Sequence, residues 1–118
     1  AALEERAFAY AKSYGAQGVD EEPKTGGSTD FAELSGKIPA ISLSIASKPK
    51  TAAGHSIEAA DATIADIGHQ GMLTASKVLA ALGVDILTDP EYLKSIKDEF
   101  TQAGPAPTVA TYKKVVRW

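Results

Sequence analysis

The residues of this chain best suited to chemistry are a histidine, His55, and an upstream aspartate, Asp30, which ends a Gly-Gly-Ser-Thr-Asp run. His55 lies between a glycine and a serine, directly before a helical pattern. Imidazole is a common zinc ligand, and a histidine at such a junction can be aimed into a crevice beyond the end of a strand. A lone histidine in a loop is, however, also typical of an ordinary surface. A zinc site needs three or four protein ligands, and no other residues of this sequence complete one around His55.

The Gly26-Gly27-Ser28-Thr29-Asp30 segment is the second candidate, and its residues have more than one interpretation. Asp30 is a possible zinc ligand, a possible second-shell partner that orients a histidine, or the N-cap of the short helical stretch that follows it. Gly26 and Gly27 either let the backbone approach a substrate closely or form a hinge. Ser28 has no evident base, so the sequence gives little support to a serine hydrolase.

His69 does not extend the site. It follows His55 by 14 positions within a helical pattern, which places it roughly 20 Å along the axis at 1.5 Å per residue. We therefore interpret His69 as an ordinary helix-surface residue.

The elements that must position these residues follow from hydrophobic periodicity. Apolar spacing of three and four predicts an amphipathic helix from Ala2 to Tyr14, stopped at Gly15. Strict alternation from Ile38 to Ile45 predicts a half-buried strand. A long helix is predicted from Ile57 or Asp61 to Asp85, with small residues suited to close packing. The other predicted elements are a loop from Gln17 to Gly27, a short helix after Asp30, a last helix with Pro90 at its first position and a linker and tail beyond Gly104.

The expected fold class is α/β, mostly helical with one or two strands. The helix-flanked mixed sheet to which these elements would belong is what the family resemblance given below implies. Residues 1–103 would form the folded part and residues 104–118 a proline-containing linker and tail. A lone half-buried strand needs partners that this chain scarcely supplies. The chain therefore looks like one piece of a larger folded body.

The order of these motifs resembles the C-terminal catalytic segment of the aminoacylase and glutamate-carboxypeptidase type of zinc metallopeptidases. The resemblance covers roughly Leu3 to Ala103 and rests on the glycine pair with its Ser/Thr-Asp step, the apolar strand and His55-Ser56-Ile57-Glu58. Asp89-Pro90-x-x-Leu93 and Asp98-Glu99-Phe100 look like the subgroup of p-aminobenzoyl-glutamate hydrolases. The tail from Gly104 departs from that pattern.

The resemblance implies a two-zinc amidohydrolase that cleaves an amide or peptide bond of an N-acyl amino acid or dipeptide. His55 would be one zinc ligand, and Gly26, Gly27, Ser28 and Asp30 would shape the acyl or carboxylate pocket. The family's other ligands and its general-base glutamate lie on polypeptide absent from this sequence, so the isolated chain would be inactive. Dimerisation in similar proteins runs through a lid domain that is also absent here.

Composition excludes several other classes. The net charge of -3 and scattered basic residues argue against nucleic acid as a partner, and the lack of cysteine excludes disulfides and thiolate metal sites. No apolar run approaches the roughly 20 residues that span a bilayer, so we expect no membrane as a partner. Two alternatives stay open: a small non-catalytic helical binding or scaffold domain, and a family member that keeps the fold without the metal. The sequence leaves the cellular compartment open.

Overall fold

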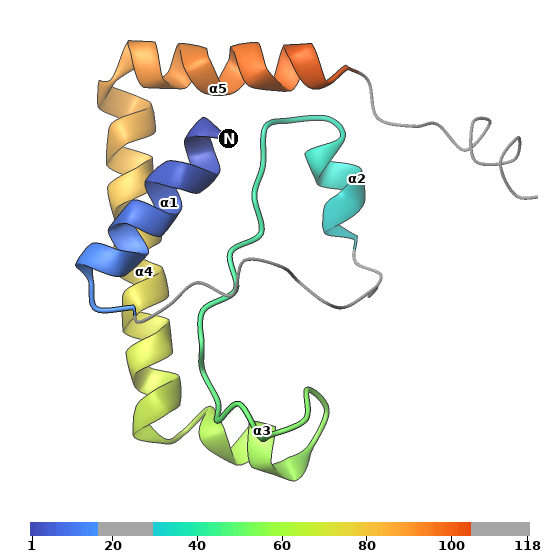
Figure 1. The fold of residues 1–118 in the computed structure, drawn as a ribbon, viewed down its shortest axis with the longest axis vertical. Helices are drawn as coiled ribbons and strands as arrows, with labels where there is room; N and C mark the ends of the chain where they lie inside the picture. Colours follow the sequence, from blue (N-terminus) through green and yellow to red (C-terminus); the bar gives the residue numbers. More distant parts are fainter. Residues whose placement is uncertain (17–29, 105–118) are drawn as a thin grey trace, which may run out of the picture.

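Helices supply all the regular structure of the residues that the computed structural model describes, 1–16 and 30–104 (Figure 1). The predicted α/β fold is wrong, because these ranges contain no strand and form an all-helical protein. The helices are α1 (Ala2–Ser13), α2 (Phe31–Ser35), α3 (Ile57–Ala62), α4 (Asp66–Thr88) and α5 (Pro90–Ala103).

The predicted strand from Ile38 to Ile45 is an extended segment that runs from the end of α2 toward α3 (Figure 1). Its alternation is real: Ile41, Leu43 and Ile45 are half-buried, whereas the serines between them are exposed. Ile41 and Leu43 pack against the core between α1 and α4. Alternation therefore reported correctly which side faces the core. A strand also needs a neighbour with ladder hydrogen bonds, and the described residues offer none.

The core lies where α1 crosses α4 and is made of small side chains. Ala7 and Ala11 of α1 are buried against Val78 and Leu82 of α4, as the three-and-four spacing predicted. The helix ends at Ser13, one residue before the predicted Tyr14, and the chain turns away at Gly15, whose φ of 94° is the left-handed conformation that favours glycine. Alanine at the contact lets the two backbones approach closely, but each alanine buries little apolar area.

A polar cluster joins the same helices above this core. The Asp85 carboxylate of α4 accepts hydrogen bonds from Arg6 Nη1 at 2.7 Å and from the Tyr10 hydroxyl at 2.6 Å, both on α1. The Arg6 guanidinium also lies 4.2 Å from the centre of the Tyr92 ring on α5, a cation–π contact. Glu99 of α5 accepts the backbone N–H of Ala2 at 2.8 Å and thereby caps α1. These contacts bind α1 to both α4 and α5.

The long helix predicted from Ile57 or Asp61 is in fact two helices. Between α3 and α4, the N–H groups of Thr63, Ile64 and Ala65 bond to carbonyls three residues back, the tight pattern of a 3₁₀ turn. The chain folds back so closely that a Cβ on Gly68 would lie 2.3 Å from the Ala62 carbonyl oxygen. Hydrophobic periodicity continues through this turn, so it did not reveal the break.

A second glycine of α4 confirms the predicted close packing. A Cβ on Gly71 would lie 2.7 Å from the carbonyl oxygen of Ala46 and 3.3 Å from Ser47, the two residues that directly follow the extended segment. Gly71 is therefore the point at which the chain leading to His55 crosses α4.

The last helix is as predicted. The Asp89 side chain accepts the Tyr92 N–H at 3.0 Å, and Pro90 occupies the first turn of α5. Tyr92 and Ile96 are buried. The helix ends at Ala103, and the predicted tail beyond Gly104 lies outside the described residues.

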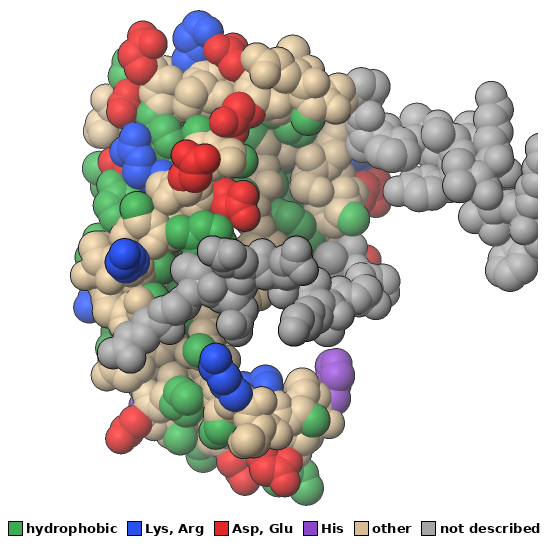
Figure 2. All heavy atoms as spheres, in the orientation of Figure 1, with side chains coloured by type: hydrophobic (Ala, Val, Ile, Leu, Met, Phe, Trp, Pro, Cys, Tyr) green, Lys and Arg blue, Asp and Glu red, His purple; other side chains and the backbone are tan. Residues whose placement is uncertain are grey.

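Many large hydrophobic side chains remain at the surface. Seven hydrophobic residues of the described part are buried, and only Val78 is a large side chain without exposure. In contrast, Leu79 is 70 % and Leu87 86 % exposed on α4. Hydrophobic side chains reach the surface along the edge that α4 occupies (Figure 2). By length and composition α4 could also cross a membrane, although core helices of soluble proteins have the same properties.

We expect the Asp85 cluster to make the free energy of unfolding fall at acidic pH. Hydrogen bonds from Tyr10 and Arg6 lower the Asp85 pKa below its unfolded value of about 3.9. Its stabilising contribution is therefore complete above that value and is lost as the pH falls through the folded-state pKa. Asp85→Asn should lower the thermal midpoint at pH 7 and show a smaller further loss at acidic pH. Circular dichroism melts from pH 7 down to about pH 2 measure both effects.

The control for that experiment is Asp66→Asn, an exposed aspartate in the first turn of the same helix. It should keep the acid dependence of the wild type. Equal acid profiles for wild type and Asp85→Asn would contradict the role given to the cluster.

Two glycines of α4 should respond oppositely to alanine. Gly71→Ala places a methyl group against the Ala46 backbone, so we expect it to destabilise the fold by about 1–3 kcal/mol, as overpacking does. Gly83→Ala meets no atom within 4 Å and should stabilise the fold by roughly 0.5–1 kcal/mol, because alanine favours a helix. Urea unfolding compares the two, and equal effects would show that the chain does not cross α4 at Gly71.

Candidate functional site

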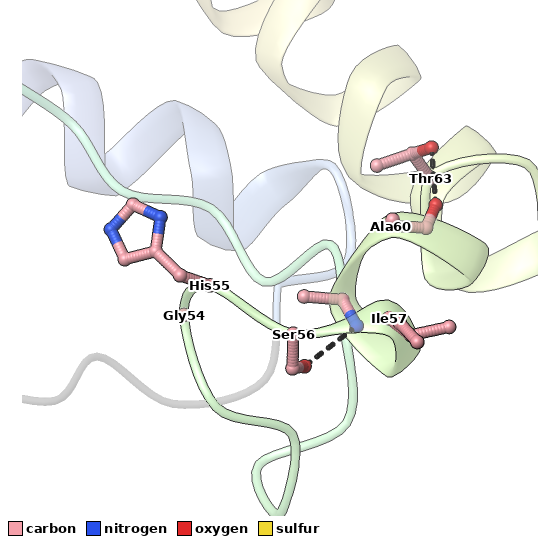
Figure 3. Close-up of a pocket in the computed structure, with 7 residues that line it drawn as sticks. Gly54, His55, Ser56, Ile57, Ala60 and Thr63 are labelled. Atoms are coloured by element: carbon pink, nitrogen blue, oxygen red, sulfur yellow. Dashed lines mark hydrogen bonds between the residues drawn. The ribbon is translucent and has the colours of Figure 1, made fainter.

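His55 lies in the turn that connects the extended segment to α3. Its side chain is exposed and makes no hydrogen bond or ion pair with the described residues. The imidazole projects away from α3, whereas the side chain of Ser56 turns toward the helix (Figure 3). Within the part of the chain that the structure describes, no group therefore occupies either ring nitrogen.

Ser56 determines how the chain enters α3. Its hydroxyl accepts the N–H of Ala59 at 3.1 Å, so Ser56 is the N-cap, and it donates to the Ala53 carbonyl oxygen at 3.1 Å. At the other end of α3, the Thr63 hydroxyl donates to the Ala60 carbonyl oxygen at 2.7 Å. The six-residue helix is thus stabilised by a hydroxyl at each end.

Glu58 belongs to the first turn of α3, as the sequence indicated. Two hydrogen bonds lower the pKa of the Glu58 carboxyl group. The larger effect comes from its own backbone N–H and the smaller from the Ser56 hydroxyl. The negative charge lies at the end of the helix where the backbone dipole favours it. Glu58 therefore has a structural explanation without a ligand.

The turn and the helix enclose an open, shallow hollow (Figure 3). Backbone and side-chain atoms of both elements form its wall. The lining residues are Gly54, His55, Ser56, Ile57, Ala59, Ala60 and Thr63. Its only ionisable side chain is that of His55, so the hollow alone has a single group suited to bind a metal or move a proton.

Asp30 directly precedes α2 but does not cap it with its side chain. Its backbone is already in the helical region, at φ -65° and ψ -15°, and the carboxylate accepts no hydrogen bond from the first turn. The N-cap interpretation of Asp30 is therefore wrong, because an N-cap side chain reaches the first turn from an extended backbone. Gly26, Gly27 and Ser28 of the predicted pocket lie outside the described residues.

No metal-binding cluster forms within residues 1–16 and 30–104. These ranges bring no three His, Asp or Glu side chains together in a way that could hold an ion. His69 is exposed on α4, as predicted. The chemistry of the donors fits zinc at one position, because a free imidazole is a good ligand, but further ligands must come from outside the described residues.

Sequence reasoning missed two interactions, one at this turn and one between α1 and α4. The Ser56 bridge had a visible signal, a serine immediately before an apolar helical pattern. The Arg6–Asp85 contact had none, since its members are 79 positions apart.

No protein-family model matches the chain, and neither does any curated protein or solved structure.

Proposed function

We propose that this chain is one segment of a zinc-dependent amidohydrolase, in which His55 supplies a single zinc ligand. The observation that carries the proposal is the exposed imidazole of His55, which has no partner among the described residues and projects from a turn closed by hydrogen bonds. A side chain without structural contacts on an ordered turn is well suited to bind something else.

The order of motifs along the chain supports the same proposal. A glycine pair and Ser-Thr-Asp precede an extended segment with one half-buried side, and the segment leads directly to His55. This succession is what resembles the zinc metallopeptidases. The substrate would be an N-acyl amino acid or a dipeptide, and Gly26, Gly27, Ser28 and Asp30 would line its pocket.

The unburied apolar surface supports a role as part of a larger body. Each large aliphatic side chain that becomes fully buried contributes about 1.5–3 kcal/mol, so covering Leu79 and Leu87 with further polypeptide would be favourable. On this proposal that polypeptide also carries the general base and the other zinc ligands. When bound, the metal lowers the pKa of a water molecule and so supplies the nucleophile. The isolated chain would be inactive.

His55→Ala tests the proposal in the longest native polypeptide that contains this chain. We expect the variant to lose zinc and to hydrolyse N-acyl amino acids at least 10–100-fold more slowly. Mutation of residues that merely hydrogen-bond to a metal ligand already causes a loss of that size. Metal content by mass spectrometry and initial rates measure both quantities. His69→Ala is the matched control, because His69 is an exposed histidine on α4 and should change neither. Unchanged zinc in His55→Ala would remove His55 from the ligand set.

The uncovered side of α4 favours a second candidate, a non-catalytic docking module whose simplest occupant is a second copy of this chain. The eight residues of this side are uncharged, and the exposed Lys77 lies at its border. An antiparallel pair about a two-fold axis between Leu79 and Ala80 would place each leucine opposite the partner's alanine. The same pairing sets Met72 opposite Leu87. The stripe comprises Met72, Leu73, Ser76, Leu79, Ala80, Gly83, Val84 and Leu87.

Leu79→Glu tests this candidate. Pairing would bring two like charges close to the axis, so sedimentation should show dissociation of any dimer at concentrations where the wild type associates. The thermal midpoint should change little, because Leu79 is mostly exposed within one chain. Leu34→Glu, an exposed leucine on α2, is the control and should leave association unchanged. A wild type that stays monomeric at all concentrations would exclude the dimer.

A further inference from the structure

We propose that a second copy of this chain pairs with residues 40–46 as an antiparallel β-strand. This pairing needs neither a metal nor the turn at His55, so it is independent of the proposed function. Within one copy all regular structure of the described residues stays helical, and a two-stranded ladder would form only between copies. The surface involved also differs from the stripe on α4.

The backbone of residues 40–46 has unused hydrogen-bonding groups. None of its N–H or C=O groups has a hydrogen-bond partner among the described residues, and the nearest amides that donate to a backbone carbonyl are those of Ile38 and Ala52. Backbone N–H and C=O groups are strong hydrogen-bonding groups, which folded proteins pair almost completely where they are buried. Only another extended backbone offers donors and acceptors at the spacing of such a row. A second strand is therefore the partner whose chemistry fits this segment.

One edge of the segment faces α4. The Ala46 carbonyl oxygen approaches that helix so closely that a Cβ on Gly71 would lie 2.7 Å from it. In an extended backbone the N–H and C=O groups of every second residue point to the same edge, so the other even-numbered residues share the edge of Ala46. The odd-numbered residues point these groups to the opposite edge, where a strand can add. They are Ile41, Leu43 and Ile45.

The sequence of the segment favours a copy of itself as that strand. Residues 40–46 read Ala-Ile-Ser-Leu-Ser-Ile-Ala, which is identical in both directions. Two copies aligned antiparallel about a two-fold axis at Leu43 place every side chain opposite an identical one. Ile41 then lies opposite the partner's Ile45, and Ser42 opposite the partner's Ser44. Cross-strand pairs of β-branched side chains and of hydroxyls stabilise a ladder.

The burial of the side chains fits this register. Ile41 and Leu43 pack against the core, whereas Ser42 and Ser44 are exposed. Pairing keeps the apolar side of each strand on its own core and brings the serines together on the outer side. Natural proteins prevent such pairing by placing charges or proline in an open edge, and residues 40–46 contain neither. The segment therefore lacks the usual protection against a second strand.

Charges at the two serines test the interface and its direction. Ser42→Glu/Ser44→Glu places glutamate opposite glutamate twice in this register. Ser42→Lys/Ser44→Glu instead places lysine opposite glutamate twice, whereas a parallel in-register pair would set lysine against lysine. Both serines are exposed, so neither variant should disturb the fold of one copy. Lys97→Glu is the matched control, because it makes the same change in net charge as the double glutamate variant at an exposed position of α5.

Sedimentation equilibrium of the complete chain at pH 7, over a range of concentrations, measures the dissociation constant of the dimer. We expect Ser42→Glu/Ser44→Glu to weaken association at least about tenfold, because like charges directly opposite one another destabilise a ladder. Ser42→Lys/Ser44→Glu should associate as tightly as the wild type or more tightly. Lys97→Glu should match the wild type.

Amide hydrogen exchange of the wild type tests the ladder itself. Where the chain is dimeric, the amides of Ile41, Leu43 and Ile45 should exchange at least about tenfold more slowly than in the monomer. The amides of Ser42 and Ser44 should not change, because they point to the edge that faces α4. Equal exchange of the first set in monomer and dimer would overturn the proposal.

Three sedimentation results would also overturn it. One is a wild type that stays monomeric up to its solubility limit. Another is equal weakening in the two serine variants, which would exclude the antiparallel register. The third is loss of association in Leu79→Glu, since pairing through residues 40–46 must persist when the α4 stripe carries a charge. None of these results depends on zinc, so the pairing and the proposed function are tested separately.

Discussion

The arrangement of the helices depends on one carboxylate, that of Asp85. The apolar contact between α1 and α4 is made largely by Ala7, Ala11, Val78 and Leu82, which interlock less than larger side chains would. Small surfaces of this kind allow a helix to slide or rotate at modest cost. Asp85 removes that freedom, because Arg6 and Tyr10 lie one turn apart on α1 and meet the same carboxylate. Arg6 then carries the constraint to Tyr92 of α5.

A shortage of buried apolar volume is the second property that organises this protein. Ile64, Leu79 and Leu87 are at least 70 % exposed, although the chain as a whole is 44 % hydrophobic. Scattered exposed leucines are ordinary, but several on one side of α4, with Lys77 only at its border, are typical of an interaction surface. Both candidate functions use this face, and they differ in what covers it. For a segment of an enzyme the cover is the rest of the catalytic body, and for a docking module it is another copy.

Local signals predicted local structure well. The three-and-four spacing around Ala7 and Ala11 and the Asp89-Pro90 step gave α1 and α5, and the alternation around Leu43 gave the correct facing of an extended segment. The sheet was wrongly predicted, because alternation reports which side is buried and contains no information about a neighbouring strand. The break before Gly68 was hidden, since a tight turn can preserve helical periodicity.

Of the candidate site, the turn at His55 was predictable from glycine, histidine and serine before a helical pattern. Its ligand role stays a prediction, because metal coordination requires residues that no local pattern can place. Asp30 shows that residue type alone does not predict a role. Aspartate favours helix capping, but the backbone of Asp30 is helical and its carboxylate makes no capping hydrogen bond. Residue type gave the possible chemistry, and backbone conformation decided whether that chemistry occurs.

The attachment of α1 has a consequence for how this protein could tolerate change. Side-chain contacts with Asp85 and Glu99 hold α1 in place. Both anchors are carboxylates, so a substitution that removes either one would loosen α1 without altering the apolar contact that Ala7 and Ala11 make. The helical frame should therefore tolerate changes among its exposed apolar residues better than changes at these two acids.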